Sequence, residues 1–206
     1  MTEATALGLP AQAFDRQDDG DDLGFYAPPR LVRHIDEAAV IALTSLYRDA
    51  IPAGGRVLDL MSSWVSHLPD DVAYGEVVGH GMNAEELAAN TRLDRWFVQD
   101  LNDVPELSEG NARYDAVLIC VGVQYLQHPL AVLVRRVLKP GGRVIISFSN
   151  RCFPTKAVAV WRALDTQGHA SLVRLYLETA GFRDATASLL ADGRLGDPLV
   201  AITGRS

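Results

Sequence analysis

Five short apolar runs constrain the fold of this chain more than any other feature of its sequence. They span residues 56–60, 76–79, 96–98, 116–121 and 143–148. Runs of this length, rich in leucine and β-branched residues, are typical of strands buried on both faces. The stretches 83–90 and 129–138 between them have helical character. Strands that alternate with helices predict an α/β fold with right-handed crossovers, a mostly parallel sheet and helices on both faces.

The two ends of the chain show different patterns. Apolar residues recur at helical spacing from Arg30 to Asp49, which predicts a helix with one buried stripe. Near the C-terminus, a helix over about Ser171–Ala180 precedes two apolar runs, Ala185–Leu190 and Leu199–Ile202, and a Gly-rich turn at 192–198 joins these runs. This order predicts a terminal antiparallel hairpin.

A length of 206 residues leaves room for one domain. Residues 1–22 contain a polar, acidic run at 17–22 and have almost nothing to bury. We therefore expect a mobile acidic leader over 1–22 and a single folded domain over 23–206.

Composition excludes several classes of function. The chain carries 26 acidic and 19 basic residues, so its formal charge is −7 and a general field attracting nucleic acid or anionic lipid is missing. No apolar run approaches the ~20 residues that cross a bilayer. Cys120 and Cys152 show no paired ligand spacing, so neither a disulfide scaffold nor a metal site is expected. These observations favour a cytoplasmic protein without nucleic-acid or membrane partners; the oligomeric state stays open.

In open α/β sheets, ligands bind beyond the carboxyl ends of the strands, where the strand order reverses. The corresponding positions here are residues 59–67, 80–85, 99–102, 122–125 and 149–152. Several of them belong to recognisable motifs.

Four segments, taken in order, resemble the motif series of the class I S-adenosylmethionine-dependent methyltransferases. They are Val57-Leu58-Asp59-Leu60, Gln99-Asp100-Leu101, Tyr114-Asp115-Ala116-Val117 and Arg136-Val137-Leu138-Lys139-Pro140-Gly141-Gly142. The resemblance covers about residues 54–150 and implies a Rossmann-like sheet with S-adenosylmethionine as cofactor. Within the domain it implies an N-terminal helical cover (23–53), a cofactor-binding core (54–150) and a substrate-side segment with the hairpin (151–206). We assign Lys139–Gly142 a purely structural turn, far from the site.

The chain departs from the family pattern at two places. The turn after the first strand, Met61–His67, holds no glycine. Ser62 and Ser63 are the smallest substitutes there, and their amides and hydroxyls could hold a carboxylate. Gly81 stands where the family has a ribose-binding carboxylate. Asn83 either supplies neutral hydrogen bonds instead or caps the following helix, and both alternatives stay open.

The resemblance places the cofactor against the ends of the first four strands. Asp100 matches the position that contacts adenine, with the Leu101 amide donating to the ring; the alternative is a solvated loop residue. Asp59 matches the acid that closes the first strand; the alternative is a buried carboxylate satisfied by local amides. The expected cofactor-binding residues are Asp59, Met61, Ser62, Ser63, Gly79, Gly81, Met82, Asn83, Gln99, Asp100, Leu101 and Cys120.

Methyl transfer is an in-line displacement, so the protein mainly aligns the reactants and excludes water. A histidine could serve as base for a protonated acceptor. The candidates are His67, expected on a short helix after the first strand, and His34; His80 is less favoured. Tyr125 could line the methyl channel or pack on a helix, and Arg151 could clamp an anion. We expect His67, Tyr125 and Arg151 as catalytic residues, and Tyr26, Arg30, His34, Asn150 and Cys152 as substrate-binding residues, with Cys152 as an inert thiol.

The sequence thus predicts a methyltransferase that acts on an O, S or N nucleophile of a small molecule. The turn lacks glycines, and position 81 lacks the ribose-binding carboxylate of the family. These two departures leave an alternative, a degenerate relative that binds or regulates without turnover. A nicotinamide-dependent oxidoreductase is a weaker alternative, because the chain lacks both its glycine fingerprint and its acidic partner.

Overall fold

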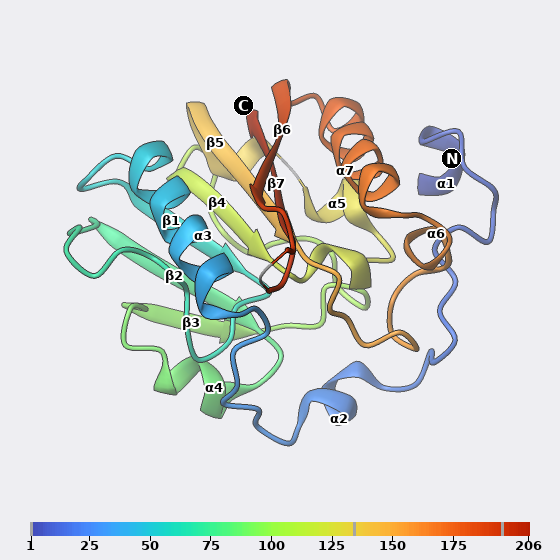
Figure 1. The fold of residues 1–206 in the computed structure, drawn as a ribbon, viewed down its shortest axis with the longest axis horizontal. Coiled ribbons are helices and arrows are strands. Elements are labelled where there is room, and N and C mark those ends of the chain that lie inside the picture. Colours follow the sequence, from blue (N-terminus) through green and yellow to red (C-terminus); the bar gives the residue numbers. More distant parts are fainter. Residues whose placement is uncertain (1, 134, 195) are drawn as a thin grey trace.

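The computed structural model of the protein describes residues 2–133, 135–194 and 196–206. Within these residues, strands form a seven-stranded sheet in the order β3-β2-β1-β4-β5-β7-β6 (Figure 1). They are β1 (Arg56–Leu60), β2 (Glu76–Gly81), β3 (Arg95–Val98), β4 (Tyr114–Cys120), β5 (Leu138–Phe148), β6 (Arg183–Ala191) and β7 (Leu199–Arg205). The strands from β3 to β5 pair in parallel, and β7 runs antiparallel between β5 and β6. The predicted sheet with its terminal hairpin is confirmed; Leu195 of the connection lies outside the described residues.

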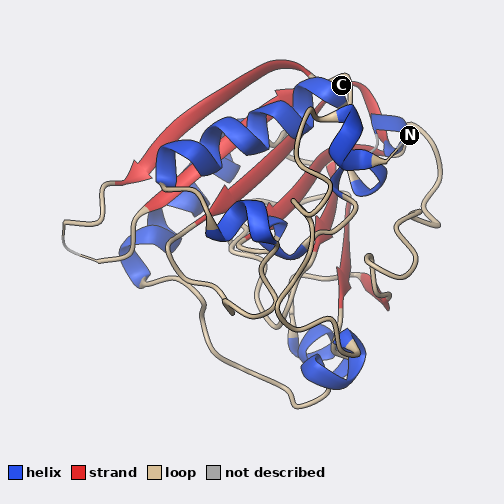
Figure 2. Cartoon of the chain, turned by 90° about the vertical axis from the view of Figure 1, so that its right-hand side faces the viewer, coloured by secondary structure: helices blue, strands red, loops and turns tan. Residues whose placement is uncertain are grey.

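Helices cover both faces of the sheet (Figures 1 and 2). The α-helices are α1 (Glu3–Ala6), α2 (Asp22–Tyr26), α3 (Glu37–Ala50), α4 (Ala84–Ala89), α5 (Pro129–Val132), α6 (Ala159–Arg162) and α7 (Thr166–Thr179); η1 (Val123–Tyr125) and η2 (Arg135–Val137) are 3-10 helices. On one face, Leu43 and Tyr47 of α3 pack on alternate strand residues such as Leu118. On the other, Val173 of α7 packs on residues such as Ile146. This alternation places apolar side chains on both faces, as expected for a buried sheet.

The predicted helix over 129–138 is wrong as a continuous element. It divides into α5 and η2, and Val134 between them lies outside the described residues. The carbonyl oxygens of Arg136 and Val137 accept hydrogen bonds from the amides of Ala112 and Arg113, at 2.7 and 2.8 Å. These carbonyls therefore pair with another segment. Residues 139–142, expected as a turn before the fifth strand, instead form an irregularity inside β5.

The expectation that residues 1–22 have almost nothing to bury is also wrong. Leu7 and Phe14 are buried in the core, and the Phe14 ring lies 6.2 Å from that of Tyr176 on α7. From α1 the chain descends past α6 to α2 and then to α3, on the side toward which the parallel strands point (Figure 1). We call residues 13–36 of this path the N-terminal strap.

Two further helical expectations fail near the strap. Helix α3 begins at Glu37 instead of Arg30, because the carboxylate of Asp36 caps it by accepting from the Ala39 amide at 2.9 Å. His34 therefore precedes the helix. After β1, residues 61–75 form no helix, so the short helix expected to carry His67 does not exist.

Candidate functional site

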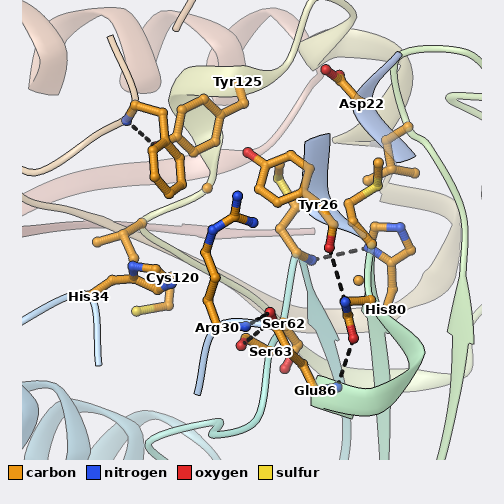
Figure 3. A pocket seen from close by; sticks show the side chains of 18 of the residues that line it. Asp22, Tyr26, Arg30, His34, Ser62, Ser63, His80, Glu86, Cys120 and Tyr125 are labelled. Atoms are coloured by element: carbon orange, nitrogen blue, oxygen red, sulfur yellow. Dashed lines mark hydrogen bonds between the residues drawn. The ribbon is translucent and has the colours of Figure 1, made fainter. Parts of the chain in front are cut away.

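A cavity of about 460 Å³ opens at the carboxyl ends of the parallel strands, where the order reverses between β1 and β4. Loops after β1, β2, β3 and β4 line one side of it, and the strap and residues 151–153 line the other (Figure 3). This is the position and size of a small-molecule site. The predicted residues that line it are Tyr26, Arg30, His34, Met61, Ser62, Ser63, Gly81, Met82, Asn83, Asp100, Leu101, Cys120, Tyr125, Arg151 and Cys152.

Three predicted residues lie away from this cavity. A Cβ at Gly79 would meet the side chain of Leu93, so Gly79 serves strand packing. The side-chain Nε2 of Gln99 donates to the carbonyl oxygens of Val104 and Glu106, at 2.5 and 3.2 Å. Asn150 is exposed outside the lining. These three residues therefore do not line the main cavity.

His67 also lies outside the main cavity. It borders a separate small cavity behind the turn after β1 and has a φ of 53°. Burial lowers the pKa of His67 to about 4, with the charge of Arg33 acting in the same direction. His67 therefore does not line the main cavity, and a catalytic base at this position stays a prediction.

Asp59 borders the same small cavity and is 3% exposed. It accepts a hydrogen bond from the Ser62 hydroxyl at 2.6 Å. Burial raises the pKa of Asp59 to about 6, against the hydrogen bonds from Ser62 and Ser66, which lower it. Asp59 is thus buried, as the alternative reading has it, but its partners are serine hydroxyls instead of the expected local amides.

The turn after β1 is held by His80 on β2. The amide of Met61 donates to His80 Nδ1 at 3.1 Å, and the amide of Ser62 donates to the His80 carbonyl oxygen at 2.7 Å. Burial lowers the pKa of His80 to about 4. The neutral imidazole of His80 thus stabilises the turn after β1.

The two serines of this turn use their hydroxyls within the protein. Ser62 donates to Asp59, and Ser63 donates to Glu86 at 2.6 Å. Glu86 also accepts from the Arg30 amide at 2.6 Å and lines the cavity. Neither serine hydroxyl is therefore free for the predicted donation to a ligand carboxylate. The sequence did not single out Glu86 as a site residue, although it stands in the helix after β2.

Gly81 shows why the carboxylate of the family pattern is absent. A Cβ at this position would overlap the carbonyl oxygen of Ser62. The turn after β1 thus occupies the space that a side chain at 81 needs, and an acid there would displace the turn.

Asn83 acts as a helix cap and as a tether. Its Oδ1 accepts from the amides of Glu85 and Glu86, at 2.9 and 3.0 Å. Its Nδ2 donates to the carbonyl oxygens of Tyr26 and Ala27, at 3.0 and 2.8 Å. Both amide hydrogens hold the strap, so the structure supports the capping alternative.

Asp100 keeps part of its carboxylate available toward the cavity. Its Oδ1 accepts from the Asn102 amide at 2.8 Å, and its Oδ2 has no partner within the described residues. Leu101, beside it, is 3% exposed and lines the same cavity. This pair offers an acceptor next to an apolar surface, which suits a flat heterocycle.

A buried group of charges fixes the strap over the cavity. Asp22 pairs with Arg16 at 2.5 Å and with Lys156 at 2.9 Å, and Asn102 donates to it at 3.2 Å. Burial would raise the pKa of Asp22, but these hydrogen bonds outweigh it and lower the pKa. The sequence does not reveal this role of Asp22, because an acidic run gives no local sign of a distant partner.

The Arg151 guanidinium is engaged through its Nε atom. It pairs with Asp197 at 2.8 Å, and its side chain is 61% exposed. Asp197 also accepts from the Asp36 amide at 3.0 Å. Arg151 therefore ties the β6–β7 connection toward the strap through Nε, and its role as an anion clamp stays a prediction.

The substrate side of the cavity is aromatic. The Tyr125 hydroxyl accepts from the Phe153 amide at 2.9 Å, and burial raises the pKa of Tyr125 to about 12. The rings of Tyr125, Tyr26 and His34 lie 6.1, 6.2 and 6.3 Å from that of Phe153. Burial lowers the pKa of His34, so this imidazole is neutral near pH 7. Arg30 extends among the labelled rings (Figure 3).

Two non-glycine residues at the cavity have a positive φ. Met61 has a φ of 56° and Val121 a φ of 46°. Both line the cavity, and a Cβ at Gly122 would meet the Met61 side chain at 2.9 Å. Such strain persists where the surrounding packing enforces it, often at functional sites.

Comparison of the sequence with protein-family models and with curated proteins finds no match. Among the described residues, no helix combines the length and the apolar character that crossing a membrane requires.

The fold, in contrast, matches solved structures of S-adenosylmethionine-dependent methyltransferases. A Haloferax volcanii complex between the Trm112 methyltransferase activator and a methyltransferase matches with a TM-score of 0.61 at 18% identity, over 82% of this chain and 90% of that chain. A methyltransferase of this kind from Aquifex aeolicus matches with a TM-score of 0.59 at 15% identity, over 89% and 96%. The (4+2) cyclase SpnF matches with a TM-score of 0.61 at 15% identity, over 87% and 89%. The expected Rossmann-like methyltransferase fold is therefore confirmed.

Proposed function

We propose that this protein is an S-adenosylmethionine-dependent methyltransferase that acts on an O, S or N nucleophile of a small molecule. One observation carries the proposal: a cavity of about 460 Å³ lies where the strand order of a methyltransferase fold reverses, with Asp100 and Leu101 on its wall. The fold alone does not suffice, because SpnF, a cyclase, shares it.

The cavity residues fit the adenosine part of this cofactor. Asp100 Oδ2 can accept from an exocyclic amine, while the buried Leu101 packs against a ring. Glu86 provides a second carboxylate on the cavity wall, after β2. When bound, the cofactor supplies an electrophilic methyl group on a sulfonium.

The protein's own residues would align the acceptor and keep water out. The strap covers the cavity and is fixed by the buried Asp22. Tyr125 keeps its proton and can donate a hydrogen bond to the acceptor. We assign the base for a protonated acceptor to His34, which lines the cavity as a neutral imidazole.

Calorimetric titration tests the cofactor assignment. We expect wild-type protein to bind S-adenosylhomocysteine and Asp100→Ala to bind it at least about tenfold more weakly, since ~1.4 kcal/mol corresponds to tenfold. Asp103→Ala, an exposed change three residues away, is the matched control. Absence of heat with S-adenosylmethionine and its product would contradict the proposal and favour the degenerate alternative. A response to NAD alone would favour the oxidoreductase.

A screen for product release then identifies the acceptor. Thiols, phenols, amines and carboxylic acids are each incubated with S-adenosylmethionine, and S-adenosylhomocysteine is measured. With an accepted phenol or thiol, His34→Gln is expected to slow turnover while S-adenosylhomocysteine affinity is kept. An unchanged rate would remove His34 from the mechanism.

A further inference from the structure

The Arg30 guanidinium lies inside an aromatic enclosure on the substrate side of the cavity. Its Cζ is 5.0 Å from the ring centre of Phe25, 5.7 Å from that of Tyr26 and 5.5 Å from that of Phe153. Nη2 donates to the Phe25 carbonyl oxygen at 3.0 Å. The rings hold the planar group in one place and exclude water from its faces.

The half-buried Arg30 lacks a carboxylate partner within the described residues. Its Nη1 is buried and has no hydrogen-bond partner within the described residues, and none of their carboxylates pairs with the guanidinium. By comparison, Lys156 is 1% exposed and pairs with both Asp22 and Asp18. A buried polar hydrogen without an acceptor is unfavourable, so a guanidinium with an unpaired Nη1 is suited to an anion.

The nearby carboxylates do not pair with the Arg30 guanidinium, because each of them is already bonded to other groups. Asp22 is occupied by Arg16, Lys156 and Asn102. Glu86 accepts from the backbone amide of Arg30 and from Ser63.

The direction of the side chain separates this site from the turn after β1. Arg30 begins near Ser62 and Ser63 and extends away from them, with its guanidinium beside the Tyr26 ring (Figure 3). An anion bound at Nη1 therefore lies among rings of the strap and of the substrate side.

We propose that Arg30 binds the carboxylate of the methyl acceptor, and that the acceptor is a small carboxylic acid with a flat apolar body. This inference rests on the proposed function. A single guanidinium with one unpaired nitrogen, Nη1, matches a monoanionic carboxylate, and the surrounding rings match the flat body.

Binding of defined probes tests the proposal without turnover. Benzoate and phenylacetate are titrated by calorimetry in the presence and absence of S-adenosylhomocysteine, against their neutral isosteres benzamide and phenylacetamide. We expect wild-type protein to bind the acids more tightly than the amides. In Arg30→Gln the ratio of acid to amide affinity should fall at least tenfold, whereas Arg30→Lys should keep part of the preference. Arg162→Gln, an exposed change on α6, should leave the preference intact.

A second ligand pair identifies the source of the carboxylate. S-adenosylhomocysteine carries one, and 5′-methylthioadenosine does not. Unchanged affinity of Arg30→Gln for both compounds supports the acceptor assignment and also shows that the variant is folded. Weaker binding of S-adenosylhomocysteine alone would assign Arg30 to the cofactor and overturn the proposal. A wild-type protein that does not prefer acids over amides would also overturn it, whereas failure of S-adenosylhomocysteine alone to bind wild-type protein would count against the proposed function.

Discussion

His80 fixes the turn after β1 through the backbone amide of Met61, which donates to Nδ1 of the imidazole at 3.1 Å. The opposite nitrogen, Nε2, contacts the carbonyl oxygen of Gln99 at 2.9 Å. Because an amide only donates and a carbonyl only accepts, Nδ1 is bare and Nε2 carries the proton. One neutral side chain on β2 thus joins the residues that follow β1 and β3.

We expect His80 to make the protein less stable as the pH falls from about 6.5 to 4. Burial lowers the pKa of the folded imidazole to about 4, against about 6.5 in the unfolded chain. Between these values the unfolded state binds a proton that the folded state does not, so the free energy of unfolding decreases, by up to about 3 kcal/mol. Urea unfolding between pH 4 and 7 measures this effect.

In the variant His80→Phe, the free energy of unfolding is expected to depend less on pH. A contribution from His67, whose folded pKa is also about 4, remains. At pH 7 the same variant should lose about 1–3 kcal/mol, because the Met61 amide is left unpaired. The exposed His128→Gln is the control. Equal slopes in wild type and His80→Phe would contradict a buried neutral imidazole.

Asp59 should act in the opposite direction. Burial raises its folded pKa to about 6, above the ordinary 3.8, so between these values the folded state binds the extra proton and acidification favours folding. At pH 7 the buried charge is unfavourable. Asp59→Asn is therefore expected to raise the free energy of unfolding at pH 7 by about 1–3 kcal/mol. Chemical denaturation at pH 5 and 7 checks this, with exposed Asp70→Asn as control; a loss of stability at pH 7 would refute the expectation.

Restoring the acid of the family pattern at position 81 should damage the site. A Cβ there overlaps the Ser62 carbonyl oxygen, so Gly81→Asp and Gly81→Ala are both expected to cost about 1–3 kcal/mol. S-adenosylhomocysteine affinity should fall as well. Gly110→Ala, where a Cβ meets nothing within 4 Å, is the control for thermal unfolding and titration. Tighter cofactor binding by Gly81→Asp would show that the turn yields and that the family arrangement is possible here.

The strap should depend on Asp22. Asp22→Asn leaves Lys156, 1% exposed, without its buried partner, and removal of one member of a buried pair costs about 3 kcal/mol. Hydrogen exchange should increase over residues 13–36 before the rest of the chain opens. Asp19→Asn, whose side chain is 66% exposed, should change little. Exchange in the strap equal to wild type would exclude the ion pairs as its anchor.

The sequence by itself determined the sheet and the place of the cavity. Runs such as 56–60 and 116–121 are apolar on both faces, and this local pattern, with helices between, admits few arrangements other than a parallel sheet. The ordered motifs then located Asp100 and Leu101 on the cavity wall.

Tertiary structure decided which charged and polar groups are free to act. Arg151 and Arg30 look alike in the sequence, but Arg151 donates through Nε to Asp197, 46 residues away, whereas Arg30 lies among rings with Nη1 unpaired. Likewise, Asp22 is one residue of a polar run in the sequence, and only the folded chain brings Lys156 within ion-pair distance of it. Local patterns encode which faces are buried, whereas the pairing of a charge depends on residues that only the folded chain brings within hydrogen-bond distance.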